Sequence, residues 1–187
     1  MRNSRNFFVL TGFILQLLTL TAGATQILYK SIEDLGREST SVVQGNVVGI
    51  NSFWNETRTK IFTETVIAVE ETYKGTEAGE VIILQLGGVV DNVRVTVHGA
   101  LQWSLGEEVV VFLEPYREGK FLVSGFSQGK FQVERDKSTG QATISRPAIE
   151  DAQLFDTPDN NTGKAGIQKI PLDQFIRQAL GRTSDSD

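Results

Sequence analysis

A run of five apolar residues, Val109-Val-Val-Phe-Leu113, constrains the fold of this chain more than any other feature. Successive side chains of a strand point to opposite faces of its sheet, so a wholly apolar strand needs cover on both faces. The run therefore predicts a central strand. We expect Val109, Val111 and Leu113 to be buried on one face and Phe112 to be buried on the other.

Short β-rich segments separated by turns make up most of the remaining chain. Between residues 61 and 69 the odd positions are all β-branched, which predicts a strand with Ile67 and Val69 facing the core. We expect a mainly β protein, namely a small OB-like barrel of five main strands with an added hairpin. The predicted strands cover residues 41–50, 61–73, 80–86, 93–98, 109–113, 121–126, 130–135 and 141–146.

Short helices are predicted at both ends of the folded region. Ser31 precedes an acidic residue by three positions, a variant of the capping box, and predicts a helix over about residues 32–38. Near the C-terminus the apolar residues Leu172, Phe175, Ile176 and Ala179 follow helical spacing. We expect a barrel domain over residues 25–146, a polar linker over 147–170, and an amphipathic helix over 171–181 that docks on the barrel.

The first 24 residues have the three parts of a secretory signal peptide. Arg2 and Arg5 give a positive start, an apolar run follows, and Ala22-Gly23-Ala24 fits the site that signal peptidase cuts. The apolar run is shorter than the roughly 20 residues of a membrane-spanning helix. We therefore expect cleavage after Ala24 and no membrane span in the mature chain. Export together with the absence of cysteine predicts a bacterial periplasmic or extracellular protein.

Composition excludes several classes of function. The 187 residues contain no cysteine and one histidine, so a Cys/His zinc site, an iron–sulfur cluster and a disulfide framework are all excluded. We expect no cofactor and no metal. The formal net charge is −5, and −7 once the predicted signal peptide is removed. This acidic balance argues against a nucleic-acid partner, since protein surfaces that bind nucleic acid are normally basic.

Aromatic residues near predicted strand ends are the candidates for binding, because exposed aromatic side chains are good anchors at interfaces. The alternative is that they plug the ends of the barrel. We expect Phe53 and Trp54, beside a polar turn, to be the stronger candidates, with Tyr73 and Trp103 behind them. Tyr116 and Phe126 also lie at predicted strand ends.

No set of catalytic residues stands out. His98 is the single histidine and is expected on the polar face of an edge strand. A carboxylate-based hydrolase acting on carbohydrate remains an alternative and would need two acids about 5–10 Å apart. Glu64 with Glu70, or Glu107 with Glu108, are the formal candidates. Single-stranded nucleic-acid binding on an OB barrel is a third possibility that the acidic charge disfavours.

Two stretches resemble the core of netrin-like modules, the group that includes the tissue inhibitors of metalloproteinases. They are residues 41–75, which begin Ser41-Val-Val-Gln-Gly45 and end in Lys74-Gly75, and residues 103–113. The resemblance covers about half the chain, implies an OB-type barrel, and extends to short exported bacterial proteins without cysteine. Those inhibitors act through an N-terminal cysteine, which is missing here, so the resemblance assigns no inhibitory residue.

From these observations we expect an exported, non-enzymatic module that binds another protein. The resemblance suggests an exported peptidase as the partner.

Overall fold

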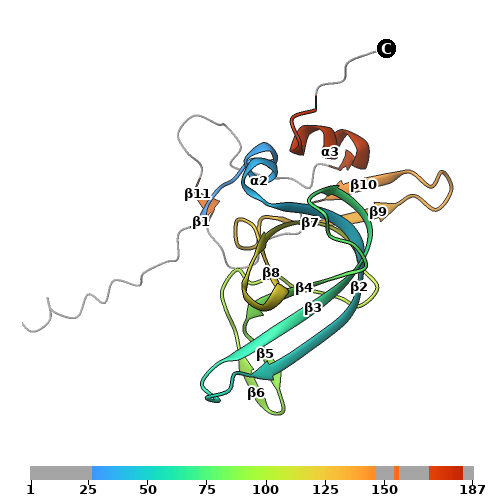
Figure 1. The fold of residues 1–187 in the computed structure, drawn as a ribbon. Helices are drawn as coiled ribbons and strands as arrows, with labels where there is room; N and C mark the ends of the chain where they lie inside the picture. Colours follow the sequence, from blue (N-terminus) through green and yellow to red (C-terminus); the bar gives the residue numbers. More distant parts are fainter. Residues whose placement is uncertain (1–26, 146–153, 156–168, 183–187) are drawn as a thin grey trace, which may run out of the picture.

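A closed five-stranded barrel forms the centre of the protein. The computed structural model describes residues 27–145, 154–155 and 169–182 (Figure 1). The barrel strands are β2 (Ser41–Trp54), β3 (Ile61–Lys74), β4 (Glu80–Leu86), β8 (Phe121–Val123) and β7 (Glu108–Pro115), given in their order around the barrel. The pairing of β4 with β8 is parallel and the other pairings are antiparallel. The fold is therefore mainly β with an OB-like barrel, as the sequence predicts.

Strand β7 has three partners. One edge pairs with β2, from Ser41↔Leu113 to Asn46↔Glu108. The other edge pairs with β9 (Lys130–Arg135) along its first half and with β8 along its second half. From β9 the sheet continues to β10 (Ala142–Ser145) and then to β12 (Ile170–Pro171). This split lets one strand belong both to the barrel and to an extension of the sheet.

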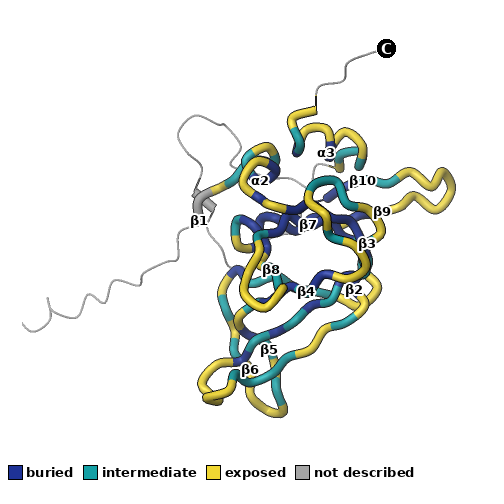
Figure 2. Tube along the Cα trace, in the orientation of Figure 1, coloured by how far each residue is buried: buried dark blue, intermediate teal, exposed yellow. Residues whose placement is uncertain are grey.

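Two hydrophobic cores lie on opposite faces of β7. Val109, Val111 and Leu113 are fully buried inside the barrel. Val110 and Phe112 are fully buried on the outer face, in a second cluster. The prediction of a central strand buried on both faces is confirmed. Figure 2 shows β7 as a buried strand between the barrel interior and the helices.

Helices α2 (Ile32–Glu38) and α3 (Leu172–Ala179) cover the outer face (Figure 1). Ser31 caps α2 by accepting a hydrogen bond from the Asp34 backbone N–H at 3.1 Å. Phe175 of α3 is fully buried, and its ring centroid lies 6.0 Å from that of Phe112 and 4.6 Å from that of Phe131. These edge and tilted aromatic contacts are the geometry that rings favour.

The two helices touch where α2 has a glycine. A Cβ atom built on Gly36 would lie 1.7 Å from the carbonyl oxygen of Ala179, so only glycine allows this approach. Lys74 at the end of β3 then caps α2, because its ammonium group donates to the carbonyl oxygens of Gly36 at 2.8 Å and Ser39 at 2.5 Å. A cation at this position also suits the negative end of the helix dipole.

The remaining elements are short. β1 (Ile27–Leu28) pairs in parallel with β11 (Leu154–Phe155), and β5 (Gly88–Val90) forms a hairpin with β6 (Val93–Val95). A 3-10 turn, η1 (Arg117–Gly119), joins β7 to β8.

Several sequence-based boundaries were wrong. The strand predicted over 93–98 ends at Val95 and belongs to the β5–β6 hairpin, since Gly88 opens a strand instead of only ending one. The strand predicted over 121–126 ends at Val123, because the chain turns at 124–129. Val69 is only partly buried, at the margin of the barrel core.

The predicted signal peptide and most of the predicted linker lie outside the described residues. Within that linker range the structure places β11, and β12 begins at its last residue. Within the described ranges, no helix is both long and apolar enough to cross a membrane.

Candidate functional site

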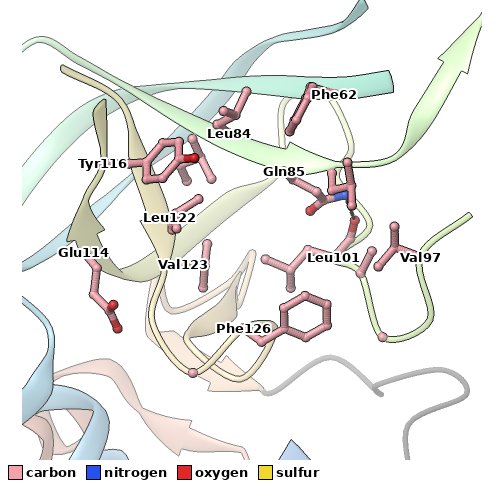
Figure 3. A pocket seen from close by; sticks show the side chains of 15 residues that line it. Phe62, Leu84, Gln85, Val97, Leu101, Glu114, Tyr116, Leu122, Val123 and Phe126 are labelled. Atoms are coloured by element: carbon pink, nitrogen blue, oxygen red, sulfur yellow. Dashed lines mark hydrogen bonds between the residues drawn. The ribbon is translucent and has the colours of Figure 1, made fainter. Parts of the chain in front are cut away.

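A cleft of about 440 Å³ opens in the barrel wall between β4 and β8 (Figure 3). Its volume lies in the range of about 300–1,000 Å³ that is typical of ligand sites. Most of its wall is apolar. The apolar side chains come from β3, β4, β8 and the loops that follow β6, β7 and β8: Phe62, Ile83, Leu84, Leu86, Val97, Ala100, Leu101, Tyr116, Leu122, Val123 and Phe126.

The cleft exists because β4 and β8 separate. Their parallel pairing consists of the single register pair Ile83↔Phe121. Beyond it β4 continues beside β3 to Leu86, whereas β8 stays with β7 and ends at Val123. The two strands therefore diverge like the sides of a wedge.

Phe126 stands at the cleft in a strained backbone conformation. It has φ of +66°, the left-handed region, and follows Gly125 at the same φ. This conformation costs a residue with a Cβ atom roughly 1–2 kcal/mol. The Phe126 side chain is nevertheless 49% exposed and lines the cleft, as Figure 3 shows. The turn thus holds a large apolar ring in a place where the fold buries only about half of the residue.

The turn that carries Phe126 is firmly attached. The buried Ser124 donates its backbone N–H to the Phe112 carbonyl at 2.8 Å, and Phe112 in turn donates its N–H to the Gly129 carbonyl at 2.9 Å. A Cβ on Gly129 would lie 2.6 Å from the Ser124 carbonyl oxygen, so the turn closes tightly. The strained conformation at Phe126 is imposed by these neighbouring contacts.

The opposite wall is a loop held by side-chain hydrogen bonds. Gln85 of β4 donates its amide to the Leu101 carbonyl at 3.0 Å and accepts from the Trp103 indole N–H at 3.4 Å. Lys130 of β9 lies 4.4 Å from the centre of the Trp103 ring and donates to Glu107 at 2.7 Å. Burial lowers the pKa of the Lys130 ammonium, and the bond to Glu107 opposes that change. These contacts make the wall a preformed surface.

Glu114 is the one carboxylate among the residues that line the cleft. It accepts a hydrogen bond from the Ser124 hydroxyl at 2.7 Å. On β7 it lies directly opposite Leu122 of β8, so both side chains point to the outside of the barrel. No cationic side chain of the described residues forms an ion pair with Glu114.

The binding residues predicted from the sequence do not form one site. Phe53 and Trp54 lie at the end of β2, next to the turn of the β2–β3 hairpin, away from the helices (Figure 1). Phe53 packs on Phe62 of β3, with ring centroids 6.4 Å apart. Because Phe62 lines the cleft, Phe53 borders the cleft indirectly.

Tyr73 and Trp103 have structural contacts in other places. The Tyr73 hydroxyl donates to the Gln44 side chain, and its ring packs against the helix-side core. Burial raises the pKa of the Tyr73 phenol. Trp103 packs against the barrel core beneath Lys130. Neither residue is among those that line the cleft, although the Trp103 bond to Gln85 helps to hold its loop wall.

Sequence reasoning missed the aliphatic part of the site. Leu84, Leu86 and Leu122 look like ordinary strand residues, and nothing in their spacing shows that β4 and β8 diverge. Phe126 and Tyr116 were named among the aromatic residues at strand ends, and both line the cleft, but neither was ranked as a binding candidate. A bulky residue directly after a glycine, in a stretch with a second glycine, is unusual for a strand and could have singled out Phe126.

The residues that could formally act in catalysis are either held in ion pairs or lie too far from one another. His98 is exposed in a loop, beyond the end of β6. Glu64 pairs with Lys120 at 2.8 Å, and Glu107 and Glu108 pair with Lys130 and Arg135. Glu64 and Glu70 are six residues apart on one strand, which separates them by about 20 Å at about 3.3 Å per residue. That distance is too long for the paired acids of a glycosidase.

Comparison with known protein families and with curated proteins found no match for this chain.

Proposed function

We propose that this protein is an exported, non-enzymatic module that binds another protein by holding an apolar segment of it in the cleft between β4 and β8. The observation that carries the proposal is Phe126. A strained residue with a half-exposed aromatic ring at the mouth of an apolar cleft gains only part of the burial available to it in the isolated fold, whereas a partner would bury the rest.

Neighbouring side chains strengthen this interpretation. Leu86 is 41% exposed, Tyr116 is 40% exposed and Leu122 is 37% exposed, and all three line the same cleft. Large apolar and aromatic side chains gathered in one concave place are typical of binding anchors.

The two alternatives have less support. A hydrolase would need two facing carboxylates, and Glu114 is alone in the cleft lining. Single-stranded nucleic acid would need a positively charged groove, whereas the one charged residue lining this cleft is acidic. An exported peptidase is the partner that the netrin-like resemblance suggests, and we propose it on that ground alone.

A display library of random peptides tests the proposal without knowledge of the natural partner. We expect selection on the folded protein to yield apolar peptides, with affinities measured by fluorescence anisotropy. Phe126→Ala and Leu122→Ser should each weaken binding by about tenfold or more, the loss expected of an interface anchor.

Leu105→Ala is the matched control, because Leu105 is 68% exposed and is not among the residues lining the cleft. Its variant should bind the peptides like the wild type. Equal binding by the Phe126 and Leu122 variants would overturn the proposal, as would a selection that yields no binding peptide.

A further inference from the structure

Strand β4 has one edge that is only partly paired. All seven of its residues pair with β3, from Phe62↔Leu86 to Ala68↔Glu80. On its other edge, the register pair Ile83↔Phe121 is the single pairing that the described residues make. The segment from Leu84 to Leu86 therefore lacks a strand neighbour on the side that faces the cleft.

Such an edge is a template for another strand, because its backbone N–H and C=O groups point outward. Natural edges are normally protected by proline, by lysine or by a bulge. The segment Leu84-Gln85-Leu86 has none of these, since it contains neither proline nor lysine and its register with β3 is unbroken. The edge is bounded by the cleft itself.

We propose that the partner segment enters the cleft as an added β-strand along the free edge of β4, and that it carries a basic side chain next to Glu114. This inference rests on the proposed function and specifies how the partner binds and what its sequence contains. Added strands gain affinity from backbone hydrogen bonds and specificity from pockets for alternate side chains.

The walls of the cleft fit a strand with apolar side chains on both faces. Ile83 and Gln85 pair with Thr65 and Thr63, which point into the barrel, whereas Leu84 and Leu86 point outward with Phe62. The inward-pointing residues of β4, Ile83 and Gln85, and its outward-pointing residues, Leu84 and Leu86, both line the cleft. A strand placed beside β4 would direct alternate side chains to the inner set and to the outer set.

The charge of Glu114 determines which side chain the partner strand should direct to the outer face of the barrel. Glu114 and Leu122 lie opposite each other on the outer face of β7 and β8. One Glu114 oxygen accepts from Ser124, and no described residue supplies a cation. A lysine or arginine on the partner strand complements this carboxylate. An anionic amphiphile such as a fatty acid would place like charges together, which makes it a poor occupant.

The experiment uses the peptides selected on the full chain as probes. Each backbone N–H of the best peptide is methylated in turn, and the affinity is measured for the wild-type protein. An added strand predicts losses of at least about tenfold at alternate positions and small losses between them, because alternate N–H groups face β4.

The charge is tested by Glu114→Gln, with Glu118→Gln as the matched control. Glu118 is an exposed carboxylate in η1 that contacts Lys120 at 3.4 Å. We expect Glu114→Gln to weaken the binding of a lysine-bearing peptide about fivefold and to leave the binding of its norleucine analogue unchanged. Glu118→Gln should change neither.

The outcomes distinguish the proposed binding function from the proposed added strand and its basic side chain. Peptides that bind through Phe126 but show no alternation on N-methylation would overturn the added strand and leave the binding function in place. Equal loss of lysine and norleucine peptides in Glu114→Gln would overturn the basic side chain. Absence of any binding peptide would overturn both the inference and the proposed function.

Discussion

The barrel has apolar side chains outside its core in two regions, and the fold treats them differently. On the outer face of the sheet, Phe112 of β7 and Phe131 of β9 are covered by Phe175 of α3 and by α2. Along β4 and β8, Leu86 and Leu122 stay more than a third exposed around the cleft. Both regions are made of the same kinds of residue.

The difference lies in what each region does for folding. The helix-covered face joins residues that are far apart in sequence, from Leu35 to Ala179, in one buried cluster. The cleft retains strain at Phe126 and exposed apolar surface, both of which lower the stability of the isolated chain. We therefore expect substitutions in the first region to change stability, and those in the second to change binding.

The largest effect is expected from Phe112→Ala. Its ring is fully buried against Phe131 and Phe175, and loss of such a ring costs about 3–5 kcal/mol, through lost burial and the cavity left behind. Denaturant titration measures the free energy of unfolding. A loss below about 1 kcal/mol would contradict the role assigned to the helix-covered face.

Gly36→Ala should come next. The added Cβ meets the Ala179 carbonyl at 1.7 Å, so α2 and α3 must move apart. We expect a loss of about 1–3 kcal/mol, the usual cost of overpacking, although alanine favours a helix more than glycine does. Gly106→Ala controls for a general glycine effect, since its Cβ would meet nothing within 4 Å. Because Gly106 has φ of +79°, the Gly106→Ala substitution should lower the stability only by the strain of placing alanine in that conformation.

Phe126→Gly should leave stability within about 1 kcal/mol of the wild type. Glycine removes the left-handed strain, and this gain offsets the lost burial of about half of the residue and the freedom added to the unfolded chain. The same variant should lose peptide binding in the anisotropy assay. If thermal unfolding instead shows a loss as large as that of Phe112→Ala, the cleft region would be part of the folding core.

The smallest effect concerns the β9–β10 turn, which leads to the helix-covered side. The Ser138 hydroxyl and the backbone N–H groups of Thr139 and Ser138 hold the pKa of Asp136 far below its usual value. A lowered carboxyl pKa stabilises the fold above the unfolded pKa, and this stabilisation is lost as pH falls through the folded pKa.

Asp136→Ala should therefore be less stable than the wild type near neutral pH, with a difference that shrinks in strong acid. Chemical denaturation at about pH 7 and about pH 2 compares the two proteins. The difference is expected to be small, because the carboxylate is exposed to solvent. A difference that grows toward acid would show that the turn contributes in another way.

Local patterns predicted much of the fold. The alternation in β3 and the Ser31 cap of α2 depend on neighbours a few residues away, and both elements form close to where they were expected. The hairpin at Gly88 and the turn at Phe126 were missed, because a glycine can end a strand or open a new one, and only the surrounding chain decides which.

The candidate site was predicted less well than the fold. Four aromatic residues were chosen by their position near strand ends, and the structure distributes them over the hairpin tip, the helix side and the loop wall. The cleft depends on where β4 leaves β8, a property of two strands that have 34 residues of chain between them. Strand-end position carries no information about that divergence.

The sequence by itself determined that a central strand would be buried on both faces, because five consecutive apolar residues in a strand permit nothing else. The tertiary structure alone decided which other apolar residues would stay uncovered. Burial depends on the partners that the closed barrel brings together, and the barrel closes β4 against β8 at one register pair only. The cleft and the strained ring of Phe126 follow from that closure.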